Sequence, residues 1–61
     1  MQFDRNLLPT LGVTWNYFPT AREAIAFAKW ADRETADDNY PCEVFVTYDS
    51  DRGYEVKARN W

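Results

Sequence analysis

The chain has 61 residues, of which 46% are hydrophobic and 18% aromatic; since disordered segments contain few aromatic residues, this predicts a single small folded domain with room for one core. It contains no histidine and only one cysteine, which argues against an internal disulfide, a zinc site built from Cys and His, and a catalytic triad with an imidazole base. Ten acidic and seven basic residues give a net charge of -3, which is unfavourable for binding phosphate backbones, so we expect a non-enzymatic protein that needs no cofactor and does not contact nucleic acid directly.

Residues 1–11 are expected to form an arm that packs over the core. Pro9 lacks a backbone N–H and disfavours a continuous helix here, yet four residues are apolar: Phe3, Leu7, Leu8 and Leu11. No basic start is followed by an apolar run, and no stretch approaches the roughly 18 apolar residues that span a bilayer. We therefore expect a soluble, intracellular protein with no membrane contact.

The segment from Gly12 to Phe18 alternates β-branched or aromatic residues with others, a pattern that predicts a strand ended by Pro19. A capping box follows, in which the Thr20 side chain can accept from the N–H of Glu23. Residues from Ala21 to about Ala36 contain no glycine or proline, so a helix is expected over this range. Its core stripe is predicted to consist of Ala21, Ala24, Ala28 and Ala31, with Phe27 and Ile25 on the shoulders.

A second strand is expected after Pro41, with Cys42, Val44, Val46 and Tyr48 on the core face. Cys42 is interpreted as a small buried hydrophobic residue rather than a reactive thiol, because no second cysteine or histidine could activate it. The run 49–53 ends in Gly53 and predicts a hairpin turn into a third strand. That strand is expected to turn Tyr54, Val56 and Ala58 inward and Glu55, Lys57, Arg59 and Trp61 outward.

These elements predict one α+β domain over residues 1–61, with order strand, helix, strand, strand and the helix packed on a three-stranded sheet. A crossover through the helix makes the first two strands parallel to each other, and the hairpin makes the third antiparallel to the second. We favour a split βαβ arrangement with the third strand in the middle. The alternative order places the second strand in the middle.

Acidic residues are concentrated between residues 32 and 51, where Arg33 is the only base. Asp37 and Asp38 follow the end of the predicted helix, where the helix dipole disfavours carboxylates, so stability alone does not explain them. The functional hypothesis is an acidic patch that binds a basic partner surface, with Trp30 as an aromatic anchor. Its acids are Asp32, Glu34, Asp37, Asp38, Glu43, Asp49 and Asp51; the alternative is that they simply solvate the helix and the loop after it.

A second candidate surface is the sheet face away from the helix, on which the alternation places Phe18, Phe45 and Trp61. Either the N-terminal arm covers these aromatics and forms a second small core, or they form a partner or self-association patch. In the second case the protein is a structural or self-associating interaction module. We expect a monomer or a homodimer.

In size, layout and charge the chain resembles the small phage-borne inhibitors of bacterial defence, anti-CRISPR proteins among them. The resemblance spans the whole chain loosely, including the helix start Thr20-Ala21-Arg22-Glu23-Ala24 and the closing run Tyr54-Glu55-Val56-Lys57-Ala58-Arg59-Asn60-Trp61. It implies a stoichiometric inhibitor in the cytoplasm of a bacterial host. Such a protein would dock on a basic, nucleic-acid-binding surface of a defence effector, in some cases by imitating DNA.

Overall fold

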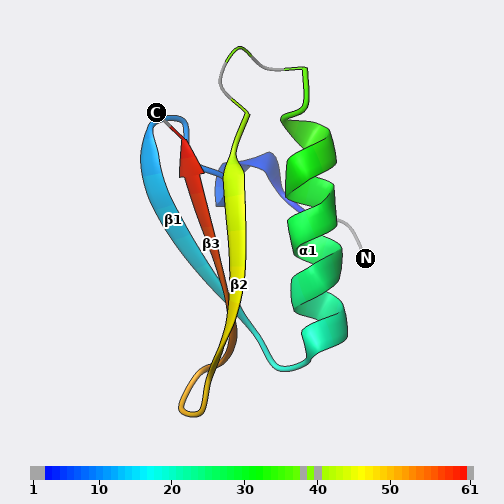
Figure 1. The fold of residues 1–61 in the computed structure, drawn as a ribbon, viewed down its shortest axis with the longest axis vertical. Coiled ribbons are helices and arrows are strands. Elements are labelled where there is room, and N and C mark those ends of the chain that lie inside the picture. The colour runs from blue at the N-terminus through cyan, green and yellow to red at the C-terminus, as the bar shows by residue number, and fades with distance from the viewer. Residues whose placement is uncertain (1–2, 38, 40, 61) are drawn as a thin grey trace.

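The computed structural model describes residues 3–37, 39 and 41–60 and shows one helix packed on one face of a three-stranded antiparallel sheet (Figure 1). In chain order the elements are the 3-10 turn η1 (Arg5–Leu7), β1 (Gly12–Phe18), α1 (Ala21–Glu34), β2 (Glu43–Asp49) and β3 (Gly53–Asn60). The expected α+β fold is therefore confirmed. The strand order is β1-β3-β2, so the favoured arrangement with the last strand in the middle is correct.

The helix α1 begins where the sequence predicted. The Thr20 side chain accepts a hydrogen bond from the Glu23 N–H at 3.2 Å, which satisfies one of the free donors of the first turn. Ala24, Phe27 and Ala31 are completely buried against the sheet, so small residues let the helix approach closely while Phe27 fills the space. Within the described residues, no helix is long and apolar enough to cross a membrane.

The β2–β3 hairpin fixes the register of the sheet. Asp49 Oδ1 accepts hydrogen bonds from the N–H groups of Asp51 and Arg52 at 2.8 and 3.3 Å, and Gly53 adopts a φ of 94°, which only glycine adopts readily. From this turn Val46 pairs with Val56 and Val44 with Ala58. Val56 and Ala58 are fully buried, which confirms the predicted inner face of β3.

The N-terminal arm lies on the helix-facing side of the sheet, beside α1. Phe3 packs against the rings of Phe27 and Trp30, with centroid distances of 5.1 and 5.5 Å. Thr14 and Asn16 of β1 both donate side-chain hydrogen bonds to the Leu7 carbonyl, at 3.1 and 3.3 Å. The arm therefore completes the inner layer next to β1 and does not form a second core on the outer face.

One predicted orientation is wrong: Phe18 points into the core and not away from the helix. Phe18 pairs with Tyr54, on the same side of the sheet as the buried Val56, and its ring lies 5.2 Å from that of Phe27. Since side chains alternate along a strand, Trp15 and Tyr17 occupy the outer face instead. The physical reason is that the polar Thr14 and Asn16 find an acceptor in the arm, so the inner face of β1 does not have to be apolar.

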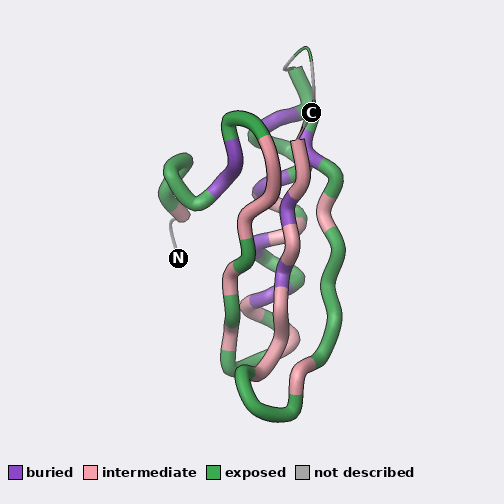
Figure 2. The backbone as a smooth tube through the Cα atoms, turned by 90° about the vertical axis from the view of Figure 1, so that its left-hand side faces the viewer, coloured by how far each residue is buried: buried purple, intermediate pink, exposed green. Residues whose placement is uncertain are grey.

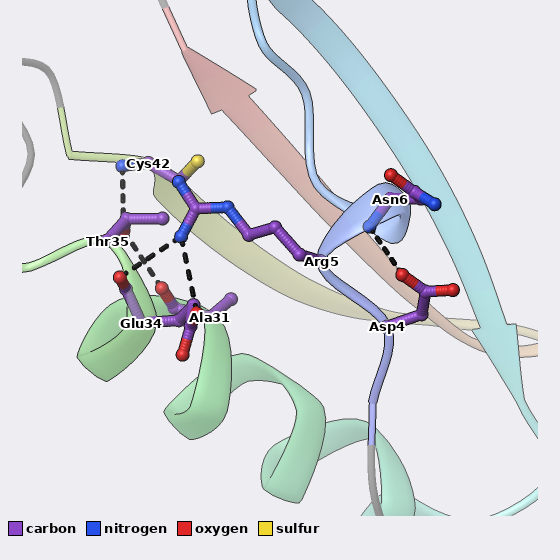
Figure 3. Close-up of polar contacts among 7 residues, drawn as sticks. All are labelled: Asp4, Arg5, Asn6, Ala31, Glu34, Thr35 and Cys42. Atoms are coloured by element: carbon purple, nitrogen blue, oxygen red, sulfur yellow. Dashed lines mark hydrogen bonds and ion pairs between the residues drawn. The ribbon is translucent and has the colours of Figure 1, made fainter.

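The α1–β2 connection is held by a buried threonine (Figure 3). Thr35 is 1% exposed; its hydroxyl donates to the Ala31 carbonyl at 2.9 Å and accepts from the Cys42 N–H at 3.1 Å. Cys42 is itself buried, in agreement with its predicted packing role. The preceding residue, Glu34, is the last of α1. Its carbonyl accepts a hydrogen bond from the Arg5 guanidinium at 3.1 Å, which ties the arm to the end of the helix.

Candidate functional site

The outer face of the sheet, opposite α1, carries exposed aromatic and charged side chains in three rows that cross all three strands. In the middle row Lys57 of β3 pairs with Trp15 of β1 on one side and Phe45 of β2 on the other. Trp15 is 54% exposed and Phe45 is 44% exposed. The rows on either side are Val13–Arg59–Glu43 and Tyr17–Glu55–Thr47.

Polar contacts hold the flanking cations over the aromatic rings. The Arg59 guanidinium lies 5.6 Å from the centre of the Phe45 ring and donates to Glu43 Oε2 at 2.8 Å. The Arg52 guanidinium lies 5.3 Å from the centre of the Tyr17 ring and donates to the Tyr17 hydroxyl at 2.8 Å. These arrangements restrict both arginines, so a partner that meets them loses less side-chain entropy on binding.

The contact with Tyr17 also stabilises the charged form of Arg52. The hydrogen bond from Arg52 to the Tyr17 hydroxyl raises the pKa of the guanidinium above its ordinary value, and the nearby Asp49 and Glu55 act in the same direction. Tyr17 in turn donates to Glu55 Oε2 at 3.2 Å. This end of the face therefore presents a cation and an anion joined through one phenol.

The outer face is open to solvent. In Figure 2 the three strands lie in front of α1, and no other described segment crosses them. The arm, which was the alternative cover for these aromatics, packs beside the helix on the opposite side. An uncovered sheet face with half-exposed aromatics at its centre is typical of a surface that contacts another molecule.

The structure separates the acidic residues that were predicted to form one patch. Asp49 and Asp51 belong to the β2–β3 hairpin, which lies at the opposite end of the molecule from the α1–β2 connection (Figure 1). The longest dimension of the molecule is 34 Å. The candidates at the other end are Asp32, Glu34, Asp37 and Glu43, so one continuous patch is not formed.

Two of the four acids at the helix end form ion pairs. Glu34 lies 3.6 Å from the Arg5 guanidinium and Glu43 lies 2.8 Å from that of Arg59. Asp32 and Asp37 are exposed, and neither forms an ion pair within the described part of the chain. Asp38 lies outside the described residues.

The predicted aromatic anchor, Trp30, is instead part of the core periphery. Its ring lies 5.6 Å from Phe27 and 5.5 Å from Phe3, so it is half buried under the arm. Phe45 is on the outer face as expected, and Trp61 lies outside the described residues. Trp15 and Tyr17 are the site residues that sequence reasoning missed.

The sequence did contain a signal for the position of the N-terminal arm beside the helix. A single helix about 10 Å wide does not cover three strands spaced about 4.8 Å apart. The apolar arm residues Phe3 and Leu8 therefore needed a place beside the helix, over β1. That placement does not by itself set the orientation of β1, which follows from the Leu7 carbonyl that the arm brings to Thr14 and Asn16.

The outer face offers aromatic and charged side chains as binding groups. Across the described ranges, no three His, Cys, Asp or Glu side chains are grouped so as to hold a metal ion. Comparisons with protein-family models, with curated proteins and with solved structures found no match to this chain. The function of the chain is therefore inferred from its surface.

Proposed function

We propose that this protein is a non-enzymatic interaction module that binds a partner protein through the outer face of its sheet. The observation that carries the proposal is the middle row, in which Trp15 and Phe45 flank Lys57 on an uncovered face. Tryptophan and arginine are enriched among the residues that contribute most to protein–protein affinity, and such residues cluster at the centre of an interface. Here the aromatics lie at the centre and the ion-paired Arg59 and Glu43 lie beside them.

The charge of this face favours a protein partner over a nucleic acid. Platforms that stack nucleic-acid bases combine aromatic rings with an excess of cations. On this face the three acids Glu43, Asp49 and Glu55 accompany the three cations Lys57, Arg59 and Arg52, and the whole chain carries a net charge of -3. Balanced charges around aromatic residues suit a protein surface, which also presents both signs.

The test is affinity capture from a bacterial lysate treated with nuclease, with the wild type and the double variant Trp15→Thr/Phe45→Thr as baits. Threonine preserves strand propensity, so the fold is expected to be retained. Tyr48→Thr is the matched control, because Tyr48 is an exposed aromatic residue on the other face of β2. We expect that the wild type and Tyr48→Thr both capture a protein that the double variant does not capture. A partner that all three baits retain equally would contradict it.

A second candidate function rests on the exposed Asp32 and Asp37 at the end of α1, neither of which forms an ion pair within the described residues. In this case the protein is a stoichiometric inhibitor that docks on a basic, nucleic-acid-binding surface of a bacterial defence effector, as its resemblance implies. Charge reversal at Asp37 and Asp38 tests it against an effector of this kind. Weaker binding of the reversed variant and a steep decrease in affinity with salt are expected. Affinity that neither change alters would eliminate this candidate.

A further inference from the structure

An apolar groove runs between α1 and β2, on the opposite side of the sheet from the proposed partner surface. Its volume is about 500 Å³, and its floor and walls include Ile25, Ala28, Val44 and Val46. Ile25 and Val46 are 46% and 38% exposed, although both point toward the interior layer. The helix therefore leaves the inner side of β2 only half covered.

The groove borders a strand edge that has no partner in the described chain. β2 is an outer strand of the order β1-β3-β2 and pairs with β3 along one edge only. The other edge presents a row of backbone N–H and C=O groups, which can pair with an added extended chain. A chain added there would turn every second side chain toward the groove.

The charges at this edge disfavour a second copy of the protein as the occupant. Glu43 and Asp49 are the first and last residues of β2. In an antiparallel pairing of two β2 strands centred on Val46, each Glu43 would lie opposite Asp49 of the other copy. Like charges directly opposite each other across two strands are destabilising, so a homodimer through this edge is opposed at both of its ends.

The same charges favour a basic segment. Asp32 lies on the rim of the groove together with one cation, Lys29, and Glu43, the first residue of β2, borders the same end of the groove while the register turns its side chain to the outer face. Asp32 is exposed and Glu43 remains largely exposed although it pairs with Arg59. Where β2 begins, a lysine or arginine of the added chain would meet Asp32 if its side chain is turned to the groove, and Glu43 if it is turned to the outer face.

We propose that the groove and the free edge of β2 together bind an extended peptide segment of another protein. The segment adds a strand to the sheet, places two apolar side chains two residues apart against Ile25 and Val46, and presents basic side chains to Asp32 on the groove side and to Glu43 on the outer side. Main-chain hydrogen bonds provide part of the affinity, and the groove provides the selectivity. The groove lies on the other side of the sheet from the outer face, so this proposal does not depend on the function proposed for that face.

The experiment selects binders from a displayed library of random linear twelve-residue peptides on the immobilised protein. A selected peptide is then synthesised and titrated into the wild type and its variants. Ile25→Arg blocks the groove and Asp32→Lys reverses the charge of its rim; both residues are exposed, and circular dichroism checks that the variants remain folded. Trp15→Thr is the control, because Trp15 lies on the outer face of β1, at the opposite edge of the sheet from the free edge of β2.

We expect the selected peptides to have apolar residues at every second position together with lysine or arginine. Each groove variant is expected to weaken binding by about tenfold or more, and Trp15→Thr to leave it unchanged. In the complex, backbone amides of β2 should gain protection from hydrogen exchange. Failure to enrich any peptide, or enrichment of peptides that lose affinity only with Trp15→Thr, would overturn the proposal. Concentration-dependent dimerisation that Ile25→Arg abolishes would also overturn it, because the occupant would then be a second copy.

Discussion

Trp15 and Phe45 lie in one row of the sheet, on opposite sides of Lys57, although 30 positions separate them in the chain. Their relationship follows from the central position of β3, which pairs with a different strand along each edge. Neither ring belongs to the core, which lies on the other side of the sheet. Folding of the core therefore does not require these two aromatic side chains.

This separation of surface from core predicts that the outer aromatics contribute little to stability. Trp15→Thr and Phe45→Thr are each expected to lower the free energy of unfolding by at most about 1 kcal/mol, as is usual for surface positions. Phe27→Ala, at a completely buried position, is expected to cost about 3–5 kcal/mol and to leave the domain largely unfolded. Urea unfolding followed by circular dichroism measures all three. Similar losses at Phe45 and Phe27 would show that the outer face is covered.

The arm is predicted to stabilise the domain through Phe3. Its ring contacts those of Phe18, Phe27 and Trp30, so Phe3→Ala is expected to lower stability by about 2–3 kcal/mol and to weaken the near-UV circular dichroism of the aromatic cluster. Leu11→Ala is the control, because Leu11 belongs to the same arm and is 79% exposed. Equal, small effects of the two substitutions would place the arm outside the folded unit.

The two glycines form a matched pair for testing the hairpin. Both have a positive φ, 106° at Gly12 and 94° at Gly53, so alanine at either position is expected to cost about 1–3 kcal/mol from backbone strain. At Gly53 the added Cβ would also lie 2.5 Å from the Phe18 carbonyl oxygen, whereas at Gly12 nothing lies within 4 Å. Gly53→Ala is therefore expected to be the more destabilising of the two by thermal unfolding. The reverse order would mean that the hairpin is placed differently relative to β1.

Thr35 is predicted to stabilise the α1–β2 connection through its hydroxyl rather than its methyl group. Thr35→Val removes the acceptor of the buried Cys42 N–H, and an unsatisfied buried donor costs about 1–3 kcal/mol. Thr35→Ser retains the hydroxyl and should recover most of the loss. If serine and valine destabilise the protein equally, the hydroxyl is not what holds the connection.

The sequence was sufficient for the elements and their order because the signals were local. Thr20 marked the start of the helix, Gly53 marked the turn, and alternating apolar residues marked the inner face of β3. The predicted helix extended to about Ala36, whereas α1 ends at Glu34 with Thr35 as its cap. Thr35 carries out a buried bridging role that no pattern in the sequence indicates, because its partner Cys42 is brought to it by the fold.

The orientation of β1 could not be predicted from alternation alone. Both faces of the strand contain an aromatic residue, Phe18 on one and Trp15 with Tyr17 on the other, so hydrophobicity gave the wrong answer. The arm decided the outcome by supplying the Leu7 carbonyl to Thr14 and Asn16. The acidic patch failed for a similar reason, since residues close in sequence are carried by β2 to opposite ends of the molecule.

The most direct test of the central claim is a calorimetric titration of the captured partner into the wild type, Trp15→Thr/Phe45→Thr and Tyr48→Thr. If the outer face is the contact surface, the double variant loses about 100-fold or more in affinity, which is the scale expected for two central aromatic residues, while Tyr48→Thr binds as the wild type does. A folded double variant that binds the partner with unchanged affinity would contradict the claim.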